Sequence, residues 1–255
     1  MKNYLIAAVL FLTALHSSAQ LKAVAYKDGT QKLNGFAAIP EKNTTNGAGI
    51  LILPAWKGID SHSKETAEKL SAQGYHAFVA DIYGEGNIPQ DSDQAGKQSG
   101  FYKRDFAAYQ KRIALALEQL ILSGANKDKI VVIGYCFGGT GALEAARAGL
   151  NVKGVVSFHG GLGKDATRSS KTITTKVLVC HGADDPYVPQ ADITAFQEEM
   201  RTSKADWQMI YYADAVHAFT EPAAGNDKSK GAAYNEKAAK RSWAHFMVFL
   251  KEVLE

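Results

Sequence analysis

Cysteine is scarce in this chain of 255 residues, and runs of five or more basic residues are absent. Two cysteines are too few for a disulfide framework or a four-cysteine zinc site. The 29 Lys and Arg and the 26 Asp and Glu give a net charge of +3. Because the basic residues are scattered, they predict neither a nucleic-acid footprint nor a polybasic membrane patch. With 46% hydrophobic residues, the chain is also too apolar for a mostly disordered protein.

The first residues form a segment of their own. Lys2 precedes an apolar stretch at residues 4–15, and the small residues Ser17, Ser18 and Ala19 follow it. This is the three-part pattern of a secretory signal peptide, and it is shorter than the roughly 20 residues of a membrane-spanning helix. We therefore expect a signal peptide at residues 1–19, export to the periplasm or the medium, and one domain at residues 20–255.

The rest of the chain alternates between short apolar runs and amphipathic stretches. Residues 21–40 suit two strands joined by a turn at Asp28–Gly29. Further strands are expected at residues 50–53, 75–80, 129–134, 152–158, 177–180 and 207–212. Helices are expected at residues 61–73, 101–123, 138–149, 191–201 and 231–254, with a long loop at 81–100. This alternation predicts an α/β fold, a mostly parallel sheet with helices on both faces.

A strand–turn–helix pattern surrounds Cys136. The segment Gly134-Tyr135-Cys136-Phe137-Gly138 has the spacing of the nucleophile elbow G-x-S-x-G, with Cys in place of Ser. In such a turn the backbone comes so close to itself that only glycine fits at the two flanking positions. The helix N-terminus favours negative charge on the sulfur, and the N–H of Phe137 points towards a developing oxyanion. Cys136 is therefore the candidate nucleophile; the alternative is an inert buried cysteine.

A cysteine nucleophile needs a base and a residue that orients the base. In elbow folds these follow the nucleophile in the order acid, then histidine. Asp184 and Asp185 both follow the strand expected at residues 177–180, and we prefer Asp185, which directly precedes a proline. Among the seven histidines, His217 lies just beyond the last expected strand, where the elbow fold places its base. Cys136, Asp185 and His217 are thus the candidate catalytic residues.

Several segments together resemble the dienelactone hydrolase family of α/β-hydrolases. They are residues 134–139 (GYCFGG), 182–189 (GADDPYVP), 217–219 (HAF) and 81–84 (DIYG). The resemblance implies an α/β-hydrolase fold of about eight strands and a Cys-His-Asp triad. It implies cleavage of carboxylic esters or lactones through a thioester, without a cofactor. It also implies an oxyanion hole built from the N–H groups of Phe137 and Trp56.

The chain departs from that family at three positions. The family carries a glutamate that holds the resting thiol, whereas this chain has Ala55, so Cys136 should face the histidine before substrate binds. The family binds a substrate carboxylate with two arginines, whereas this chain has Glu85 and Glu221. A carboxylate repels a substrate of like charge and lacks the paired donors of arginine. We therefore expect neutral short-chain esters to be better substrates than an anionic dienelactone.

Further residues are expected to contact substrate at the mouth of the site. Lys57 offers a positive charge, and His159 ends the strand expected at residues 152–158. Tyr83 and Phe219, together with Glu85, belong to or follow the segments that resemble the family. We expect all five side chains to line the substrate site.

The remaining candidates for special chemistry are weak. Cys180 ends an apolar strand and is expected to be an inert buried residue. A strand between those of Cys136 and Cys180 would hold the two too far apart for a disulfide. The histidines lack metal-ligand spacing such as H-x-x-x-H, so neither a metal nor another cofactor is expected.

Together these patterns predict an exported hydrolase of a small-molecule ester or lactone. We expect a monomer or dimer with no nucleic-acid or membrane partner. Acyl transfer would use the same residues with a different acceptor, and the sequence does not separate the two reactions. A non-catalytic binding protein is a further alternative, which the set of Cys136, Asp185 and His217 disfavours because binding alone does not need all three.

Overall fold

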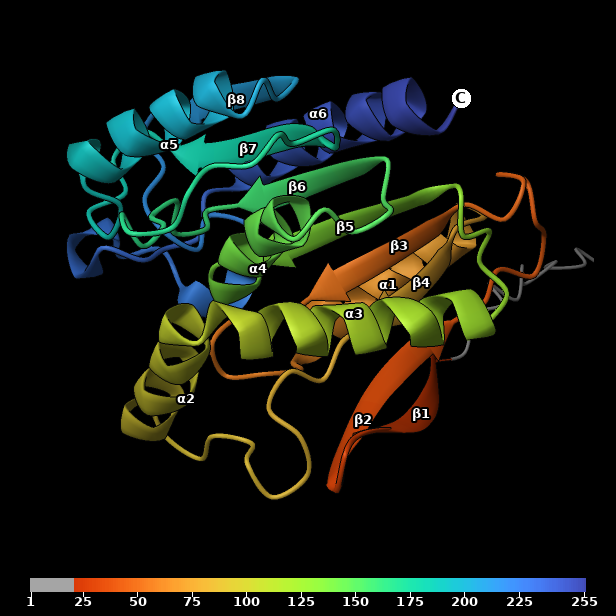
Figure 1. The fold of residues 1–255 in the computed structure, drawn as a ribbon. Helices are drawn as coiled ribbons and strands as arrows, with labels where there is room; N and C mark the ends of the chain where they lie inside the picture. Colours follow the sequence, from red (N-terminus) through yellow and green to blue (C-terminus); the bar gives the residue numbers. More distant parts are fainter. Residues whose placement is uncertain (1–20) are drawn as a thin grey trace, which may run out of the picture.

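The computed structural model describes residues 21–255, and the predicted signal peptide at residues 1–19 lies outside the described residues. An eight-stranded sheet forms its centre, with the strand order β1-β2-β4-β3-β5-β6-β7-β8 (Figure 1). The strands are β1 (Leu21–Asp28), β2 (Gln31–Ala38), β3 (Gly49–Leu53), β4 (His76–Val79), β5 (Ile130–Tyr135), β6 (Gly154–Phe158), β7 (Lys176–Gly182) and β8 (Trp207–Tyr212). β2 pairs antiparallel with β1 and β4, and every other pair is parallel. The predicted mostly parallel sheet is confirmed.

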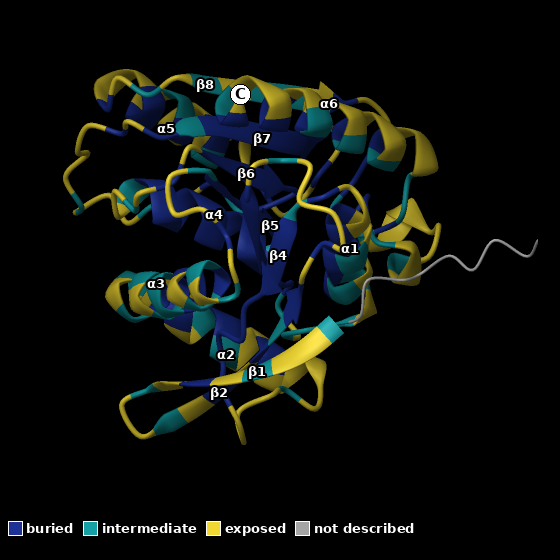
Figure 2. Ribbon diagram, turned by 90° about the vertical axis from the view of Figure 1, so that its right-hand side faces the viewer, coloured by how far each residue is buried: buried dark blue, intermediate teal, exposed yellow. Residues whose placement is uncertain are grey.

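Helices cover both faces of the sheet. They are α1 (Ser61–Ala72), α2 (Ser92–Arg104), α3 (Phe106–Leu122), α4 (Phe137–Arg147), α5 (Gln190–Thr202) and α6 (Glu236–Leu254). Apolar side chains of α3, α4 and α5 pack on one face, and those of α1 and α6 pack on the other. The central strands are buried on both sides (Figure 2), which explains their continuous apolar runs. Within residues 21–255, no helix combines the length and apolar character that crossing a bilayer requires.

The strand order has a topological switch point at β3: the strand that follows it in the chain, β4, lies on one side of it, and β5 lies on the other. In open α/β sheets, ligands bind at the carboxyl ends of the strands where such a reversal occurs. Leu53 at the end of β3 pairs with Gly134 in β5, so the loops that follow these two strands begin side by side. Trp56 lies in the first loop and Cys136 in the second, which places both at this reversal.

The predicted loop at residues 81–100 is wrong in its second half. α2 begins at Ser92, because the Asp91 side chain caps its first turn through a 2.8 Å hydrogen bond. The single helix predicted at residues 101–123 is also interrupted, since Asp105 ends α2 and caps α3. Most side chains of α2 are polar, so its helical periodicity is weak in the sequence.

The closing helix begins at Glu236 rather than at Gly231, because Asn235 caps its first turn. The residues before it run extended, and Ala232 forms a parallel bridge with His217. Backbone hydrogen bonds of 3.2 and 3.0 Å flank this bridge. The loop that carries the candidate base is therefore held by a segment that the sequence pattern assigned to a helix.

Candidate active site

Cys136 lies at a sharp turn between β5 and α4. Its φ of 53° falls in the left-handed region, which is strained for any residue other than glycine. A Cβ atom on Gly134 would overlap the carbonyl of Gly138, and one on Gly138 would overlap the carbonyl of Leu53. Both positions therefore require glycine, as the elbow pattern predicts. The same close contact presses the end of β3 against the start of α4.

Cys136, His217 and Asp185 form one hydrogen-bonded line. The Cys136 sulfur lies 3.0 Å from Nε2 of His217, and Nδ1 of His217 lies 2.8 Å from Oδ2 of Asp185. The Asp185 side chain is fully buried, and its second oxygen accepts the N–H of Tyr187 at 2.9 Å. Asp184 is exposed, so Asp185 is the aspartate that reaches the histidine. The sulfur faces the imidazole, as expected for a site without the glutamate that holds the thiol in the family.

The charge state of His217 follows from these two partners. Burial disfavours the imidazolium form, but the hydrogen bonds to Asp185 and Cys136 outweigh it and raise the pKa of His217. The carboxylate can only accept, so Nδ1 of His217 donates to it and Nε2 is left to exchange a proton with the sulfur. The Nε2 atom is thus within hydrogen-bond distance of the sulfur for proton exchange, and the thiolate is the nucleophilic form of cysteine.

Two rings support the plane of the His217 imidazole. Tyr187 and His159 contact it edge-on from two sides, each with a centroid distance of 5.3 Å. His159 is fully buried, its Nε2 lies 2.8 Å from Oγ1 of Thr220, and burial holds the pKa of His159 well below its usual range. Phe219 is also fully buried, with its ring 5.2 Å from that of His159. The expected contact of His159 and Phe219 with substrate stays a prediction, and both side chains are fully buried in the structure.

Two backbone N–H groups near the elbow are the predicted donors to a developing oxyanion. Phe137 is the first residue of α4, where an N–H has no partner inside the helix. Trp56 lies in the loop after β3, which the contact of Gly138 with Leu53 holds beside the elbow. Neither N–H donates to an acceptor within residues 21–255. Phe137 and Trp56 are thus available as an oxyanion hole.

The other three expected substrate contacts lie in different surroundings. Tyr83 is buried, and its hydroxyl donates to the Trp56 carbonyl at 2.7 Å, so it supports the Trp56 loop. Glu85 is exposed, and its carboxylate lies 3.9 Å from the ammonium of Lys32 in β2. The expected substrate role of both residues stays a prediction. Lys57 is exposed, with Nζ 5.9 Å from the Trp56 ring centroid.

Glu221 is the acidic residue that remains near the base. It is half-buried, and burial together with repulsion from Asp60 raises the pKa of Glu221 to about 7, against the opposing effect of His217. Near neutral pH the site therefore gains a negative charge as the solution becomes more alkaline.

Two cavities border the site. One of about 200 Å³ lies beside the start of α4, between α2 and the loop after β6; it includes Thr140, Gly161 and Tyr187 in its lining. Another of about 330 Å³ lies between α1 and α6 behind Tyr135 and Thr220. Tyr187 lines the smaller cavity and also contacts the His217 ring, so the cavity shares one residue with the surroundings of the base. Across residues 21–255 no group of three or more His, Cys, Asp or Glu side chains is placed to hold a metal ion.

Three residues that shape the site escaped prediction. Tyr187 lies two positions after Asp185 and Thr220 three after His217, so nearness to a motif was the available signal. Tyr109 donates its hydroxyl proton to the Phe137 carbonyl at 3.0 Å from within α3. Nothing in the local sequence of α3 points to that contact, because it joins residues far apart in the chain.

The fold, the elbow and the Cys136–His217–Asp185 line define an α/β-hydrolase. The model of the dienelactone hydrolase family matches residues 33–254, and the chain belongs to that family. It is accordingly a carboxylic-ester hydrolase whose substrate the family leaves open.

Known proteins resemble the chain over most of its length. A solved structure named m3DLH is 34% identical, with a TM-score of 0.87, over 92% of this chain and 99% of the other. A dienelactone hydrolase-like promiscuous phosphotriesterase from metagenomic libraries is also 34% identical, with a TM-score of 0.86, over 92% and 98%. A Bradyrhizobium protein named "Probable 2-oxo-3-(5-oxofuran-2-ylidene)propanoate lactonase" is 26% identical over 79% of this chain and 82% of its own length.

Proposed function

We propose that the protein hydrolyses a neutral carboxylic ester or lactone through a thioester on Cys136. The observation that carries this proposal is the hydrogen-bonded line from the Cys136 sulfur through His217 to Asp185. A nucleophile, a base and a residue that orients the base, within hydrogen-bond reach of one another, are the parts that nucleophilic catalysis needs.

The reaction has two halves. In the first, the Cys136 thiolate adds to the ester carbonyl, and the oxyanion is received by the N–H groups of Phe137 and Trp56. The intermediate collapses, the carbon–oxygen bond to the leaving group breaks, and the His217 imidazolium gives its Nε2 proton to the departing alkoxide. A thioester on Cys136 and neutral His217 remain, with Asp185 holding Nδ1–H.

In the second half, His217 removes a proton from water as the water adds to the thioester carbonyl. The new oxyanion is received by the same two N–H groups. Its collapse breaks the carbon–sulfur bond, releases the carboxylic acid and restores the thiolate–imidazolium pair. For a lactone, the alcohol and the acid leave as one molecule.

Neutral substrates are favoured by the charge around the base. Glu221 is half-buried near His217, and it becomes negative as the pH rises through about 7. The cavity of about 200 Å³ beside Tyr187 has room for a short substituent of the ester. Short-chain neutral esters therefore match the site better than a substrate with its own carboxylate.

The test is hydrolysis of short p-nitrophenyl esters, with and without prior treatment with iodoacetamide. We expect hydrolysis by the untreated protein, loss of activity on alkylation, and a mass shift on Cys136 equal to the acyl group when the reaction is stopped early. Cys180→Ala is the matched control and should retain both activity and labelling. Activity that survives alkylation of Cys136, or an acyl group found on another residue, would refute the thioester route.

We also propose that the protein is exported, on the signal-peptide pattern of residues 1–19. Expression of the full chain in a bacterium, followed by fractionation and N-terminal sequencing, tests this. The expected result is a periplasmic or secreted product beginning at Gln20. An intact chain in the cytoplasm would contradict it.

A further inference from the structure

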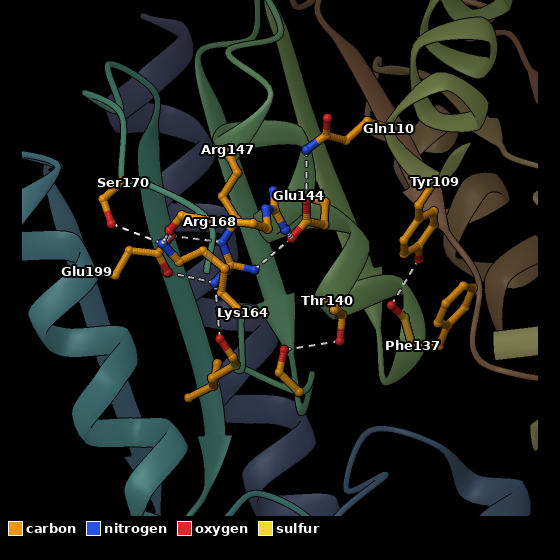
Figure 3. A network of polar contacts seen from close by, with 12 residues as sticks. Tyr109, Gln110, Phe137, Thr140, Glu144, Arg147, Lys164, Arg168, Ser170 and Glu199 are labelled. Atoms are coloured by element: carbon orange, nitrogen blue, oxygen red, sulfur yellow. Dashed lines mark hydrogen bonds and ion pairs between the residues drawn. The ribbon is translucent and has the colours of Figure 1, made fainter. Parts of the chain in front are cut away.

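We propose that Tyr83 and Tyr109 are a pair of positioning residues that hold the two halves of the oxyanion hole in place. The inference rests on the proposed function, because it assigns a role within the same reaction. Tyr109 donates its hydroxyl proton to the carbonyl of Phe137 at 3.0 Å (Figure 3). Tyr83 donates its hydroxyl proton to the carbonyl of Trp56 at 2.7 Å. Each residue that offers an N–H to the oxyanion is thus bound, at its own carbonyl, by a buried phenol.

The two tyrosines reach the oxyanion hole from separate elements. Tyr109 lies in α3, whereas Tyr83 lies in the loop after β4. Both rings stack on the Phe137 ring. The Tyr109 ring has a centroid distance of 4.6 Å and an interplanar angle of 1°, and the Tyr83 ring has a centroid distance of 5.8 Å and an angle of 21°. The Phe137 side chain and carbonyl are therefore both held, and Trp56 is tied to the same ring cluster through Tyr83.

Burial makes these two hydrogen bonds hard to replace. Tyr109 is fully buried and Tyr83 is 2% exposed, so water cannot take over as donor to the two carbonyls. Burial also raises the pKa of Tyr83 and of Tyr109, which keeps both phenols protonated as donors throughout the pH range in which the protein is folded.

The hole needs such support because neither N–H is held by a hydrogen bond of its own within residues 21–255. Trp56 lies in a turn outside any helix or strand, and Phe137 follows Cys136, whose backbone is strained at a φ of 53°. The carbonyl and the N–H of one residue belong to neighbouring peptide planes that meet at its Cα, so a carbonyl held by a buried donor limits how far that Cα and its N–H can shift. Groups that stabilise a transition state must be held within about 0.5 Å and 10–20° of the productive geometry. The tyrosines supply this restraint before substrate arrives.

The experiment compares an ester with its thionoester, in which sulfur replaces the carbonyl oxygen. Sulfur is a weak hydrogen-bond acceptor, so an aligned oxyanion hole favours the ester, and a misaligned hole loses part of that preference. Tyr83→Phe and Tyr109→Phe remove one hydroxyl each and keep the ring. We expect each to lower kcat for the ester about tenfold, to leave KM within about twofold, and to shift the kcat/KM ratio towards the thionoester.

Tyr212→Phe is the matched control. Its hydroxyl is also buried in the protein, where it contacts Nδ1 of His245 at 2.9 Å, but it touches neither oxyanion residue. This variant should lose comparable stability and keep the wild-type ester-to-thionoester ratio. One lost buried hydrogen bond costs less than the free energy of unfolding of a typical domain, so the variants are expected to fold. If Tyr109→Phe cannot be purified, Tyr83→Phe decides the result alone.

The outcomes separate the two proposals. A wild-type protein without esterase activity, or an active Cys136→Ala variant, refutes the proposed function. Full wild-type activity with an unchanged ester-to-thionoester ratio in Tyr83→Phe refutes the positioning role. Equal losses of kcat/KM for the ester and the thionoester also refute the positioning role, because they indicate that the hydroxyls contribute to packing alone.

Discussion

The two ends of α4 are built in opposite ways. At its first turn, Cys136 has a strained backbone, and the N–H of Phe137 has no acceptor within residues 21–255. At its last turns, Glu144 and Arg147 are buried, and both lie in a network of ion pairs (Figure 3). One helix therefore carries a reactive end with open hydrogen-bonding positions and an anchoring end whose charges are paired.

The anchoring end ties a loop to the body of the protein. The Glu144 carboxylate accepts a hydrogen bond from each terminal nitrogen of Arg168 at 2.9 Å. Arg147 donates a hydrogen bond to Glu199 of α5 at 2.7 Å. Arg168 lies in the long connection between β6 and β7, which also forms part of the wall of the 200 Å³ cavity. Burial alone would raise the pKa of Glu144, but its two arginine partners outweigh this and lower it.

Paired charges and unpaired donors suit different parts of the site. A paired buried charge is held in one geometry and resists removal, which suits a wall of the site. An unpaired donor at a helix start is free to meet a charge that appears only during the reaction. Four substitutions, three in and around the active site and one in the ion-pair network, test this difference.

The largest effect is expected at the reactive end, for Cys136→Ala. Loss of the nucleophile should lower kcat at least ~10³-fold, as for other enzymes that lose a catalytic nucleophile. Cys180→Ala is the comparison, since burial raises the pKa of Cys180 to about 12 and a protonated buried thiol does not react. Initial rates with a p-nitrophenyl ester measure both. Retained activity in Cys136→Ala would move the nucleophile elsewhere.

The next effect concerns the aspartate. Asp185→Asn should lower kcat about 10²-fold, because the amide no longer stabilises the imidazolium or fixes its tautomer. Asp184→Asn changes the same residue type one position earlier, at an exposed site, and should stay near the wild-type rate. The two variants are compared in kcat at one pH. The reverse ranking would assign the acid to Asp184.

At the anchoring end, Glu144→Gln should act on stability more than on chemistry. Breaking a buried ion network leaves arginine charge uncompensated and costs about 3 kcal/mol. Thermal unfolding measures the loss, and Glu236→Gln, at an exposed pair with Lys240, should show no measurable change. A fall in kcat as large as that of Asp185→Asn, with an unchanged Tm, would contradict the division between the two ends.

The pH dependence of that loss has a definite sign. The pKa of Glu144 is lower in the folded protein than its ordinary value of 4.5. Its contribution is therefore present above pH 4.5 and is lost as the pH falls through the folded-state pKa. The Tm difference between wild type and Glu144→Gln should be full at neutral pH and should shrink in strong acid.

The smallest effect is one of substrate choice. With Glu221 ionised, an anionic ester meets about 1 kcal/mol of repulsion, or roughly fivefold in kcat/KM. Because the pKa of Glu221 is about 7, the preference for a neutral ester over its anionic analogue should rise with pH around that value. Glu221→Gln should flatten this rise. A preference that stays pH-dependent in the variant would place the controlling charge on another residue.

Local patterns predicted the parts of the site that depend on local contacts. Gly134 is required by the carbonyl of Gly138, four residues along the chain, and the G-x-C-x-G spacing identifies the elbow. Gly138 is required by the carbonyl of Leu53, which comes from another strand. The burial of strands β3 to β7 is visible as continuous apolar runs. In contrast, α2 is polar, and its start depends on one capping side chain, Asp91, so the pattern read as a loop.

Residue patterns along the chain were enough to predict the elbow, the chain order of Cys136, Asp185 and His217, and the α/β class. Which loop side chains are buried and which are exposed became visible in the three-dimensional packing alone. His159 is fully buried against the His217 ring, and Phe219 is fully buried against His159. Whether a loop side chain is buried or exposed depends on what packs against it from distant parts of the chain, and spacing along the sequence does not contain that information.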